Sequence, residues 1–331
     1  MSVSLKAPLP RPIPRTGSVE RVSQGIPNLV VSVPTEELAA DLAPLPEGVD
    51  LVVWPMDAPA PRDRFDMVVP PYMSMAHVLE RLDGVSVGLV QSQSIGYESV
   101  ADLLPEGMRF ANASSVHETS TAEFALALTL AALRRIPTFV RAQDEQRWAT
   151  EFTQSLADRR VLLLGYGGVG KAIAARLAGF EVEITAVATR ARDEDGMPVH
   201  GVDELPTLLP RAEVVIVSLP GGDSTRHFVD DAFLAALPDG ALVVNVGRGP
   251  IIDTDALVDH ASRGRIRAAL DVTDPEPLPE GHPLWSLPGV LIAPHVGGAS
   301  TAMRPRVAKL VKGQIARLLA GEQPANVVIG G

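Results

Sequence analysis

Short apolar runs alternate with helical patterns from about residue 29 onward, and each run is bounded by Pro, Asp or Gly. Continuous apolar runs of this length are typical of strands buried on both faces, as in a parallel sheet. Thr35 predicts a helix start, because its hydroxyl can accept from a free backbone amide and the two glutamates after it oppose the helix dipole. The first third is therefore βαβ-like. Its strands are expected at 29–33, 51–54, 67–69 and 85–90.

A longer segment beginning at Thr119 is apolar on nearly every side between Phe124 and Leu133, and it ends at two arginines before Pro137. A helix that is apolar all round must be buried all round. We therefore expect this helix to lie between domains or subunits, with a kink or break near Pro137.

The next segment has the order strand, glycine turn, helix. A strand at 160–164 leads into G-x-G-x-x-G at Gly165, Gly167 and Gly170, and a helix follows to Leu177. Strands that alternate with helical stretches predict an α/β protein with doubly wound parallel sheets. Further strands are expected at 182–188, 214–218, 241–246, 266–270, 290–293 and 326–329, with a last helix at 301–320.

The glycine turn has the form of a dinucleotide-binding site. There the first glycine permits the tight turn, the second lets the backbone approach a pyrophosphate, and the third lets helix and strand pack closely. A purely structural turn is the alternative, and the flanking strand and helix favour the dinucleotide site. The cofactor contacts expected here are Tyr166, Gly167, Gly168, Val169 and Gly170.

The end of the following strand bears on which dinucleotide is bound. An NAD site places an acidic residue there to accept from the ribose hydroxyls, whereas residues 186–192 contain none. Thr189 can donate one hydrogen bond to a 2′-phosphate, and Arg190 or Arg192 can donate charge-assisted ones. We expect NADP(H) to be preferred and NAD(H) to be usable. The alternative is that these arginines are solvated loop residues.

Composition removes several classes of function. The 331 residues carry 29 Lys and Arg against 40 Asp and Glu, and the net charge of −11 would repel a nucleic-acid backbone. Without cysteine there is no disulfide, thiolate metal site or thiol nucleophile, so a reducing, cytoplasmic location fits best. No apolar run could cross a bilayer and no histidine pair has metal-ligand spacing, so neither a membrane nor a metal is expected. Residues 1–27 lack the apolar stretch of a secretory signal and are expected to be a loose tail.

Three later segments each follow a predicted strand and carry a charged or titratable side chain that can take part in catalysis. They are Asn245–Gly249 with Arg248, Asp271–Pro277 with Glu276, and Pro294–Gly298 with His295. Ligands of doubly wound sheets bind beyond the carboxyl ends of the strands. The arginine, glutamate and histidine are therefore expected to converge on one sheet edge.

With the glycine turn, these segments resemble the D-isomer-specific 2-hydroxyacid dehydrogenase family, whose signatures are an N-x-x-R-G strand end, D-V-x-x-x-E-P and P-H-x-x-G. The resemblance runs from about Val30 and includes Thr-Ala-Glu at Thr121, Asp-Thr-Asp-Ala-Leu from Asp253 and His-Pro-Leu-Trp from His282. It implies a Rossmann cofactor domain inserted into a flavodoxin-like substrate domain. It also implies hydride transfer from NAD(P)H to a small 2-oxo acid, giving a D-2-hydroxy acid.

By this resemblance, Arg248 holds the substrate carboxylate and polarises the keto oxygen, since its fork matches a carboxylate. His295 donates a proton to that oxygen and acts as the base in the reverse direction. Glu276 hydrogen-bonds the other imidazole nitrogen and favours the charged ring. The alternatives are a structural ion pair for Arg248, a helix-start carboxylate for Glu276 and a core histidine for His295.

Further contacts are implied by the resemblance. Ser94, Ile95 and Gly96 would offer backbone amides to the substrate carboxylate, and Tyr72 either faces the cleft or packs on the surface. Cofactor contacts, with ordinary strand-end packing as their alternative, are expected from Thr121, Leu219, Pro220, Val246, Gly247, Asp271 and Gly297.

The chain departs from the family pattern in one loop. The family usually has Pro-Leu-Thr, but here Pro220 is followed by Gly221 and Gly222. Because glycine restricts the backbone least, we expect a looser loop with doubtful phosphate contacts.

The family's interrupted topology gives the expected domains. These are a tail at 1–27, a substrate domain at 28–117 plus 298–331, and a dinucleotide-binding domain at 118–297. Hinges at 116–118 and 296–299 would let the cleft close and expel water. The helix from Thr119 resembles the family's dimer contact, so a homodimer is expected.

The main hypothesis is reduction of a small 2-oxo acid in the style of a glyoxylate or hydroxypyruvate reductase. One alternative is a pathway-specific or phosphoglycerate-type dehydrogenase. The other is a nucleotide-sensing scaffold, like the corepressors related to the family, which keeps the motifs without significant turnover. Assays with a panel of 2-oxo acids separate the enzyme from the scaffold.

Overall fold

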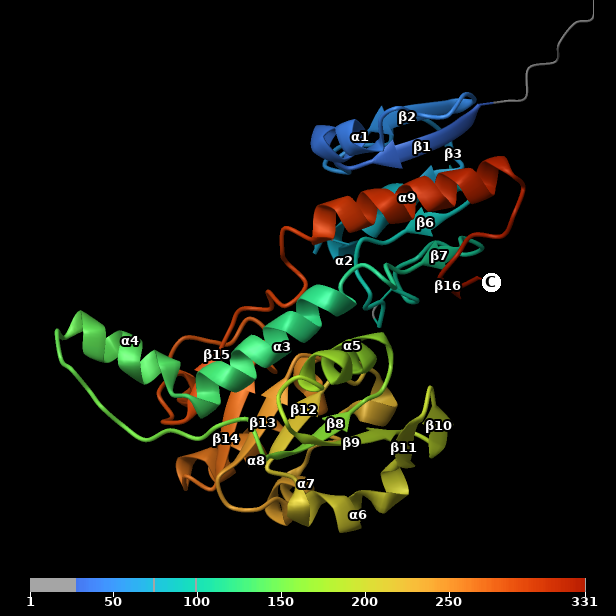
Figure 1. Ribbon diagram of the computed structural model, residues 1–331. Coiled ribbons are helices and arrows are strands. Elements are labelled where there is room, and N and C mark those ends of the chain that lie inside the picture. Colours follow the sequence, from blue (N-terminus) through green and yellow to red (C-terminus); the bar gives the residue numbers. More distant parts are fainter. Residues whose placement is uncertain (1–27, 74, 99, 331) are drawn as a thin grey trace, which may run out of the picture.

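The chain forms two α/β units, each built on its own mainly parallel sheet (Figure 1). The structure, a computed structural model, describes residues 28–73, 75–98 and 100–330. The loose tail expected at 1–27 lies outside the described residues. The predicted two-domain α/β fold is confirmed.

The first unit carries a six-stranded sheet with helices on both faces. Its elements are β1 (Leu29–Val33), α1 (Glu36–Leu42), β2 (Val49–Val53), β4 (Met67–Val68), α2 (Met75–Val78), β6 (Val90–Gln91), β7 (Phe110–Ala111), α9 (Met303–Leu319) and β16 (Val327–Ile329). The strand order is β16-β7-β6-β4-β1-β2, and only β16 is antiparallel to its neighbour. Without β16 the order is that of flavodoxin-like sheets. Thr35 caps α1 as predicted, since its Oγ1 accepts from the Leu38 amide at 3.2 Å.

The single strand predicted at 85–90 is wrong. This run forms β5 (Ser86–Val87), which pairs with β3 (Arg64–Phe65) in a separate small sheet, and then β6. Between the two, the Gly88 amide donates to the Phe65 carbonyl, and a Cβ on Gly88 would lie 2.8 Å from the Asp66 carbonyl oxygen. The chain therefore steps between sheets at this glycine. The apolar pattern alone does not reveal that step.

The second unit carries an eight-stranded sheet. Its elements are β8 (Arg160–Leu164), α5 (Gly168–Leu177), β9 (Glu183–Ala188), β10 (Arg192–Glu194), β11 (Met197–Gly201), α6 (Leu205–Leu208), β12 (Val214–Val217), α7 (Asp231–Ala236), β13 (Ala241–Asn245), α8 (Thr254–Ser262), β14 (Ile266–Leu270) and β15 (Val290–Ile292). The order is β10-β11-β9-β8-β12-β13-β14-β15, and only β10 is antiparallel to its neighbour. The order reverses between β8 and β12, which is where doubly wound sheets bind their ligands.

Alternate residues of β8 face the two layers that cover this sheet. Val161 and Leu163 pack in one apolar cluster with α5 and with α3 (Glu118–Leu133), which also contacts β13, β14 and β15. Leu162 and Leu164 pack in the other cluster with side chains from α6, α7 and α8. Both faces are thus buried, as the unbroken apolar runs predict.

The long apolar helix predicted from Thr119 is α3. Half of its residues are buried, and Glu123 and Ala127 are exposed, so the single chain does not cover it on every side. Arg135 adopts a left-handed conformation with φ of 53°, and α4 (Ile136–Asp144) starts next to it. The predicted break near Pro137 is therefore confirmed. We call residues 136–152 the arm; α4 projects away from both sheets (Figure 1).

The C-terminal segment returns to the first unit, where α9 packs near α1. Gln314 of α9 is buried and donates to Gln91 Oε1 at 2.6 Å and to the Ala325 carbonyl at 2.8 Å. These bonds tie α9 to β6 and to the segment before β16. Within the described residues, no helix combines the length and apolar character that a membrane crossing requires.

Candidate active site

The glycine turn links β8 to α5. Gly165 has φ of 105°, a conformation that side chains rarely adopt, and a Cβ on Gly170 would lie 2.1 Å from the Gly165 carbonyl oxygen. These two glycines are therefore required by the turn itself. A Cβ on Gly167, in contrast, would meet nothing within 4 Å. The backbone at Gly167 faces open space.

The start of α5 fits the pyrophosphate of a dinucleotide. Gly167 is the N-cap, and no side chain of the described residues caps the first turn. Free amides at a helix N-terminus favour an anion through hydrogen bonds and through the helix dipole. Tyr166, which is buried, and Gly168, Val169 and Gly170 complete this turn.

The residues expected to select the cofactor follow β9. Thr189, Arg190 and Arg192 are all exposed and lie beside the glycine turn, because β9 neighbours β8 in the sheet. Their position at the strand end is the one from which a dinucleotide fold contacts the adenosine ribose.

Arg192 is held against the turn by a hairpin that the sequence did not predict. Its Nε donates to Glu194 Oε2 at 2.7 Å, and its Nη2 donates to the Tyr166 carbonyl at 3.3 Å. Glu194 also pairs with Lys171 on α5. Hydrogen bonds from Lys171 and then Arg192 hold the pKa of Glu194 below its usual value. An acidic residue is thus present near this edge, further along the chain than the strand end.

Arg248 is held by a turn directly after β13. Asn245 Nδ2 donates to the Arg248 carbonyl at 2.9 Å, and Asn245 Oδ1 accepts from the Gly247 amide at 3.0 Å. Nη1 of Arg248 donates to the Gly247 carbonyl at 2.7 Å, and its Nε lies 3.2 Å from Glu98 Oε1. The asparagine of the motif therefore shapes the turn that presents the arginine.

The loops after β13 and β14 touch at Gly249. A Cβ there would lie 1.8 Å from the Thr273 carbonyl oxygen, so only glycine allows this approach. The contact brings the loop of Arg248 beside the loop of Glu276.

Glu276 and His295 form a hydrogen-bonded pair. His295 Nδ1 lies 2.6 Å from Glu276 Oε1, and each side chain is between a third and two-fifths exposed. His295 has left-handed backbone with φ of 54°, and its amide donates to the Asp271 carbonyl at 2.8 Å. With Nδ1 engaged by the glutamate, Nε2 is the nitrogen that remains for a ligand.

This pair shifts both pKa values. The hydrogen bond to Glu276 raises the pKa of His295 above its usual value; burial opposes the shift, and the charge of Glu276 adds to it. Burial acts to raise the pKa of Glu276, but the hydrogen bond and charge of His295 outweigh burial and leave it below its usual value. The positive charge of Arg248 acts to lower both the pKa of Glu276 and the pKa of His295, so the three side chains share one electrostatic environment.

Asp271 anchors the segment after β15. It is 3% exposed, and its carboxylate accepts from the Val296 amide at 2.8 Å and from the Gly297 amide at 2.9 Å. Burial raises the pKa of Asp271, and these two amides oppose the shift. Both carboxylate oxygens are thus bound by the protein's own backbone.

The first unit contributes the loop after β6. The Ser94 amide donates to Ser92 Oγ at 2.8 Å, whereas no acceptor among the described residues binds the amides of Ile95 and Gly96. A Cβ on Gly96 would lie 1.7 Å from Nη2 of Arg248. The arginine of the second unit therefore reaches this loop, and together they can bind a carboxylate.

Tyr72 lies at the boundary between the units. Its ring stacks on His117 at 5.6 Å, and burial, followed by the charge of Asp271, raises its pKa. His117 Nε2 lies 2.6 Å from the Gln93 carbonyl oxygen and Nδ1 lies 3.2 Å from that of Gly298. Sequence reasoning did not single out His117 as a site residue, although it lies in the expected hinge at 116–118.

The remaining expected cofactor residues lie at the same edge of the second sheet. Leu219 and Pro220 follow β12, and Val246 and Gly247 follow β13. Val246 is buried and packs with the cluster under α3, whose first turns carry the buried Thr121.

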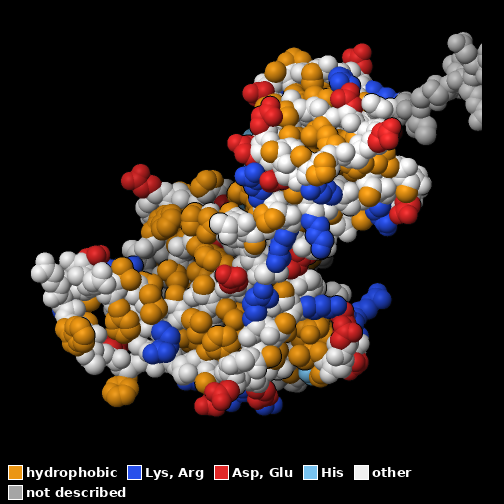
Figure 2. All heavy atoms as spheres, turned by 45° about the horizontal axis from the view of Figure 1, so that its top comes forward, with side chains coloured by type: hydrophobic (Ala, Val, Ile, Leu, Met, Phe, Trp, Pro, Cys, Tyr) orange, Lys and Arg blue, Asp and Glu red, His pale blue; other side chains and the backbone are white. Residues whose placement is uncertain are grey.

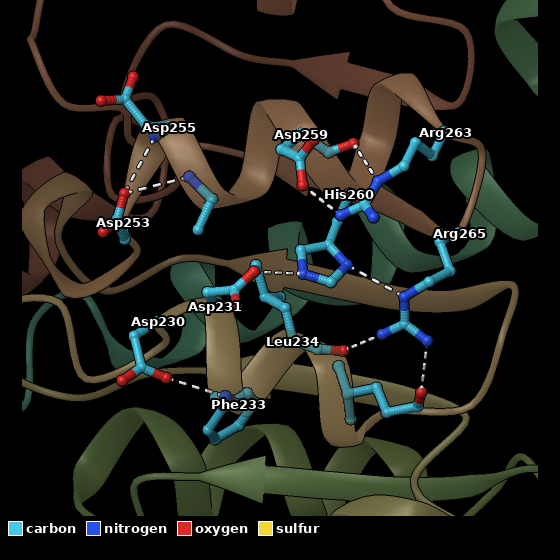
Figure 3. Close-up of polar contacts among 12 residues, drawn as sticks. Asp230, Asp231, Phe233, Leu234, Asp253, Asp255, Asp259, His260, Arg263 and Arg265 are labelled. Atoms are coloured by element: carbon cyan, nitrogen blue, oxygen red, sulfur yellow. Dashed lines mark hydrogen bonds and ion pairs between the residues drawn. The ribbon is translucent and has the colours of Figure 1, made fainter.

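Another group of acidic and imidazole side chains lies between α7 and α8 (Figure 3). Asp231, Asp259 and His260 bring metal-ligand atoms close together. However, Nε of Arg265 donates to His260 Nδ1 at 3.0 Å, so the ring proton lies on Nε2, which donates to Asp231 Oδ1 at 2.9 Å. Both ring nitrogens are used, and the histidine has no lone pair for an ion.

The order of the second sheet and the glycine turn define a dinucleotide-binding α/β protein. The family model described as "D-isomer specific 2-hydroxyacid dehydrogenase, NAD binding domain" matches residues 126–297. The chain belongs to this family of NAD(P)-dependent oxidoreductases, and the predicted resemblance is confirmed.

Two named relatives and one solved structure illustrate the similarity. A glyoxylate reductase of Thermofilum pendens is 31% identical over 264 residues, which cover 76% of this chain and 77% of the relative. A glyoxylate/hydroxypyruvate reductase B of Pectobacterium atrosepticum is 31% identical over 246 residues, 71% of this chain and 77% of the relative. An NADPH-dependent glyoxylate/hydroxypyruvate reductase of Sinorhizobium meliloti, solved with NADP and malonate, has a TM-score of 0.75 at 28% identity. That match covers 92% of this chain and 97% of the solved chain.

The open space at Gly167 generates a prediction about cofactor binding. Gly167→Ala leaves the fold intact, because the new methyl group meets no protein atom. It weakens dinucleotide binding about tenfold, a loss of about 1.4 kcal/mol, because the methyl group occupies the ligand's approach. Calorimetric titration with NADPH measures the loss, and the melting temperature checks the fold. Gly179→Ala, also without a neighbour within 4 Å, is the matched control; equal affinities in the two variants would contradict the prediction.

Proposed function

We propose that this protein reduces a small 2-oxo acid to a D-2-hydroxy acid, in the manner of a glyoxylate or hydroxypyruvate reductase. The carrying observation is the grouping of Arg248 with the Glu276–His295 pair at the sheet edge that holds the glycine turn. The names of the two reductase relatives and of the Sinorhizobium meliloti structure support the same substrate class.

In this mechanism the cationic fork of Arg248 and the amides of Ile95 and Gly96 bind the substrate carboxylate. Arg248 also polarises the keto oxygen. His295 donates its Nε2 proton to that oxygen, and Glu276 keeps the ring oriented and charged. The nicotinamide dinucleotide supplies the hydride to the keto carbon when it is bound.

We propose NADP(H) as the preferred cofactor, because Arg190 and Arg192 lie beside the turn and can donate charge-assisted bonds to a 2′-phosphate. The solved relative that contains NADP supports this preference. The turn residues 166–170 hold the pyrophosphate. Thr121, Leu219, Pro220, Val246, Gly247, Asp271 and Gly297 line the remainder of the cofactor site, and Thr189 contacts the ribose phosphate.

We also propose the functional division of the two units. Residues 28–117 plus 298–331 bind substrate, residues 118–297 bind the dinucleotide, and closure turns about 116–118 and 296–299. Tyr72 faces the resulting cleft. A cytoplasmic location is proposed from the absence of cysteine.

The test is NADPH oxidation with glyoxylate, hydroxypyruvate and other 2-oxo acids, with NADH in parallel. We expect turnover of at least one acid. The efficiency with NADPH should exceed that with NADH about tenfold or more, which is the contribution of one hydrogen bond to a charged group. His295→Ala removes the proposed proton donor and should lower turnover about 10²-fold or more. It serves as the reference for loss of the chemical step. Tight NADPH binding without turnover would favour the sensing scaffold, and an NADH efficiency equal to that with NADPH would refute the cofactor preference.

The raised pKa of His295 sets the pH dependence. Reduction needs the protonated ring, so kcat/KM falls as pH rises through a pKa that lies above the usual histidine value. Glu276→Gln removes the charge that raises this pKa, and burial then lowers it, so the alkaline limb moves to lower pH. Glu280→Gln, an exposed carboxylate on the same connection, leaves the limb in place. If the alkaline limb of the pH profile does not move in Glu276→Gln, the Glu276–His295 pair does not set the pKa of the proton donor.

We propose a homodimer whose contact includes the arm. The arm carries large exposed apolar side chains, with Ile136 48%, Val140 51% and Trp148 96% exposed, and Figure 2 shows hydrophobic side chains gathered on the projecting part of the molecule. Exposed apolar surface of this kind marks an association site. A dimer with two-fold symmetry would also cover the exposed positions Glu123 and Ala127 of α3.

Light scattering tests the homodimer. The wild-type chain should have twice the mass of one protomer. Val140→Asp and Trp148→Asp together should give the mass of one protomer with unchanged circular dichroism, because each buries a charge in the contact. Glu145→Ala, an exposed polar position of the arm, should stay dimeric. A wild-type chain at the mass of one protomer would remove the proposal.

A further inference from the structure

One carboxylate of the first unit reaches the arginine of the second. Glu98 lies two residues beyond Gly96, and its Oε1 lies 3.2 Å from Nε of Arg248. The same oxygen accepts from the Gly221 amide at 3.1 Å. Glu98 therefore bridges the loop after β6 and the loops after β12 and β13, across the candidate site.

Gly221 makes room for this bridge. A Cβ there would lie 3.1 Å from Cγ of Arg248 and 3.1 Å from Cγ and Oε1 of Glu98, tighter than ordinary contact. The departure from the Pro-Leu-Thr pattern thus has a structural counterpart, because a side chain at 221 would crowd the glutamate. The loop is also held internally, since the Thr225 hydroxyl donates to the Pro220 carbonyl at 2.8 Å. Hydrogen bonds at Gly221 and Thr225 thus hold this loop, for which the glycines alone predict a looser backbone.

The bridge fixes how Arg248 presents its fork. Nε is paired with Glu98, and Nη1 donates to the Gly247 carbonyl. Nη2 lies against Gly96, in the loop whose Ile95 and Gly96 amides have no acceptor among the described residues. The arginine side chain is 32% exposed, so packing alone leaves it rotational freedom that the carboxylate removes.

We propose that Glu98 is a positioning residue that aligns Arg248 with the amides of Ile95 and Gly96. The absence of a side chain at Gly221 leaves room for Glu98 in this position. This positioning role rests on the proposed function, because a substrate carboxylate is what the aligned fork binds. Two effects oppose each other here. The negative charge of Glu98 disfavours an anionic substrate, whereas alignment favours it, and the proposal is that alignment dominates.

Two substitutions separate alignment from charge. Glu98→Ala removes both, whereas Glu98→Gln removes the charge but keeps an oxygen that accepts from the Gly221 amide and from Arg248. We expect Glu98→Ala to raise the KM for the 2-oxo acid about tenfold, with a smaller change in kcat, and Glu98→Gln to recover most of that loss. Glu106→Ala, an exposed carboxylate on the same connection, is the matched control and should change neither constant.

Oxamate, an unreactive analogue of a 2-oxo acid, gives a readout without turnover. Calorimetric titration of oxamate into each NADPH-loaded variant should show about tenfold weaker binding for Glu98→Ala and recovery for Glu98→Gln. Gly221→Ala should weaken oxamate binding in the wild-type background and much less in the Glu98→Ala background. Melting temperatures confirm that each variant is folded.

The outcomes separate this proposal from the function on which it rests. Tighter oxamate binding in both Glu98 variants would mean that the carboxylate only competes with the ligand, and unchanged binding in Glu98→Ala would mean that Arg248 needs no alignment. Either result overturns the positioning role. A wild-type chain that binds oxamate with the expected variant pattern but reduces no 2-oxo acid would defeat the proposed function alone.

Discussion

The candidate site depends on the bonds between Asp271 and the segment after β15. The buried carboxylate accepts from two backbone amides, and the main-chain carbonyl of the same residue accepts from the His295 amide. Loss of the side chain would leave two amides unpaired, at a cost of about 1–3 kcal/mol each. A left-handed, non-glycine residue costs about 1–3 kcal/mol, which these bonds can offset. The unusual backbone of His295 is therefore held by Asp271, and its imidazole is hydrogen-bonded to Glu276.

Two carboxylates at this edge have pKa values shifted in opposite directions, because their surroundings differ. Asp271 is buried and bound by backbone amides, and its pKa is raised by burial. Glu276 is more exposed and bound by an imidazole, and its pKa is lowered. The glutamate therefore stays an anion over a wide pH range and can stabilise the charged ring. Position rather than residue type thus gives one acid an anchoring role and the other an electrostatic one.

Much of the second unit could be predicted from the sequence, because its strands are unbroken apolar runs. The strands at 160–164 and 266–270 match their predicted bounds, since burial on both faces leaves a clear signal. The first unit was harder: β7 has two residues, and the run at 85–90 divides at Gly88 because of a backbone contact with Asp66. Short strands whose partners are distant in sequence leave no periodic pattern.

The site was predictable to the extent that its residues sit in motifs at strand ends. Arg248, Glu276 and His295 follow three parallel neighbours, so one edge collects them. Glu98 and Glu194 were not anticipated, because each acts through a partner more than 20 positions away in the chain. The available signal was that Glu98 lies two residues after Gly96, which was expected to contact the substrate carboxylate. It becomes meaningful only when folding places Gly221 and Arg248 beside it.

Glu194 decides how the cofactor preference should be understood. It pairs with Arg192, one of the two arginines proposed to bind a 2′-phosphate, and would compete with that phosphate. Exposed ion pairs of this kind contribute only about 0–1 kcal/mol, whereas a hydrogen bond to a charged group contributes about 1.5–3 kcal/mol. A phosphate with nearly two negative charges and three acceptor oxygens is therefore expected to outcompete one carboxylate for Arg192. Arg192, in β10, is held close to the glycine turn by its bond to the Tyr166 carbonyl, while its side chain stays 40% exposed and open to a phosphate.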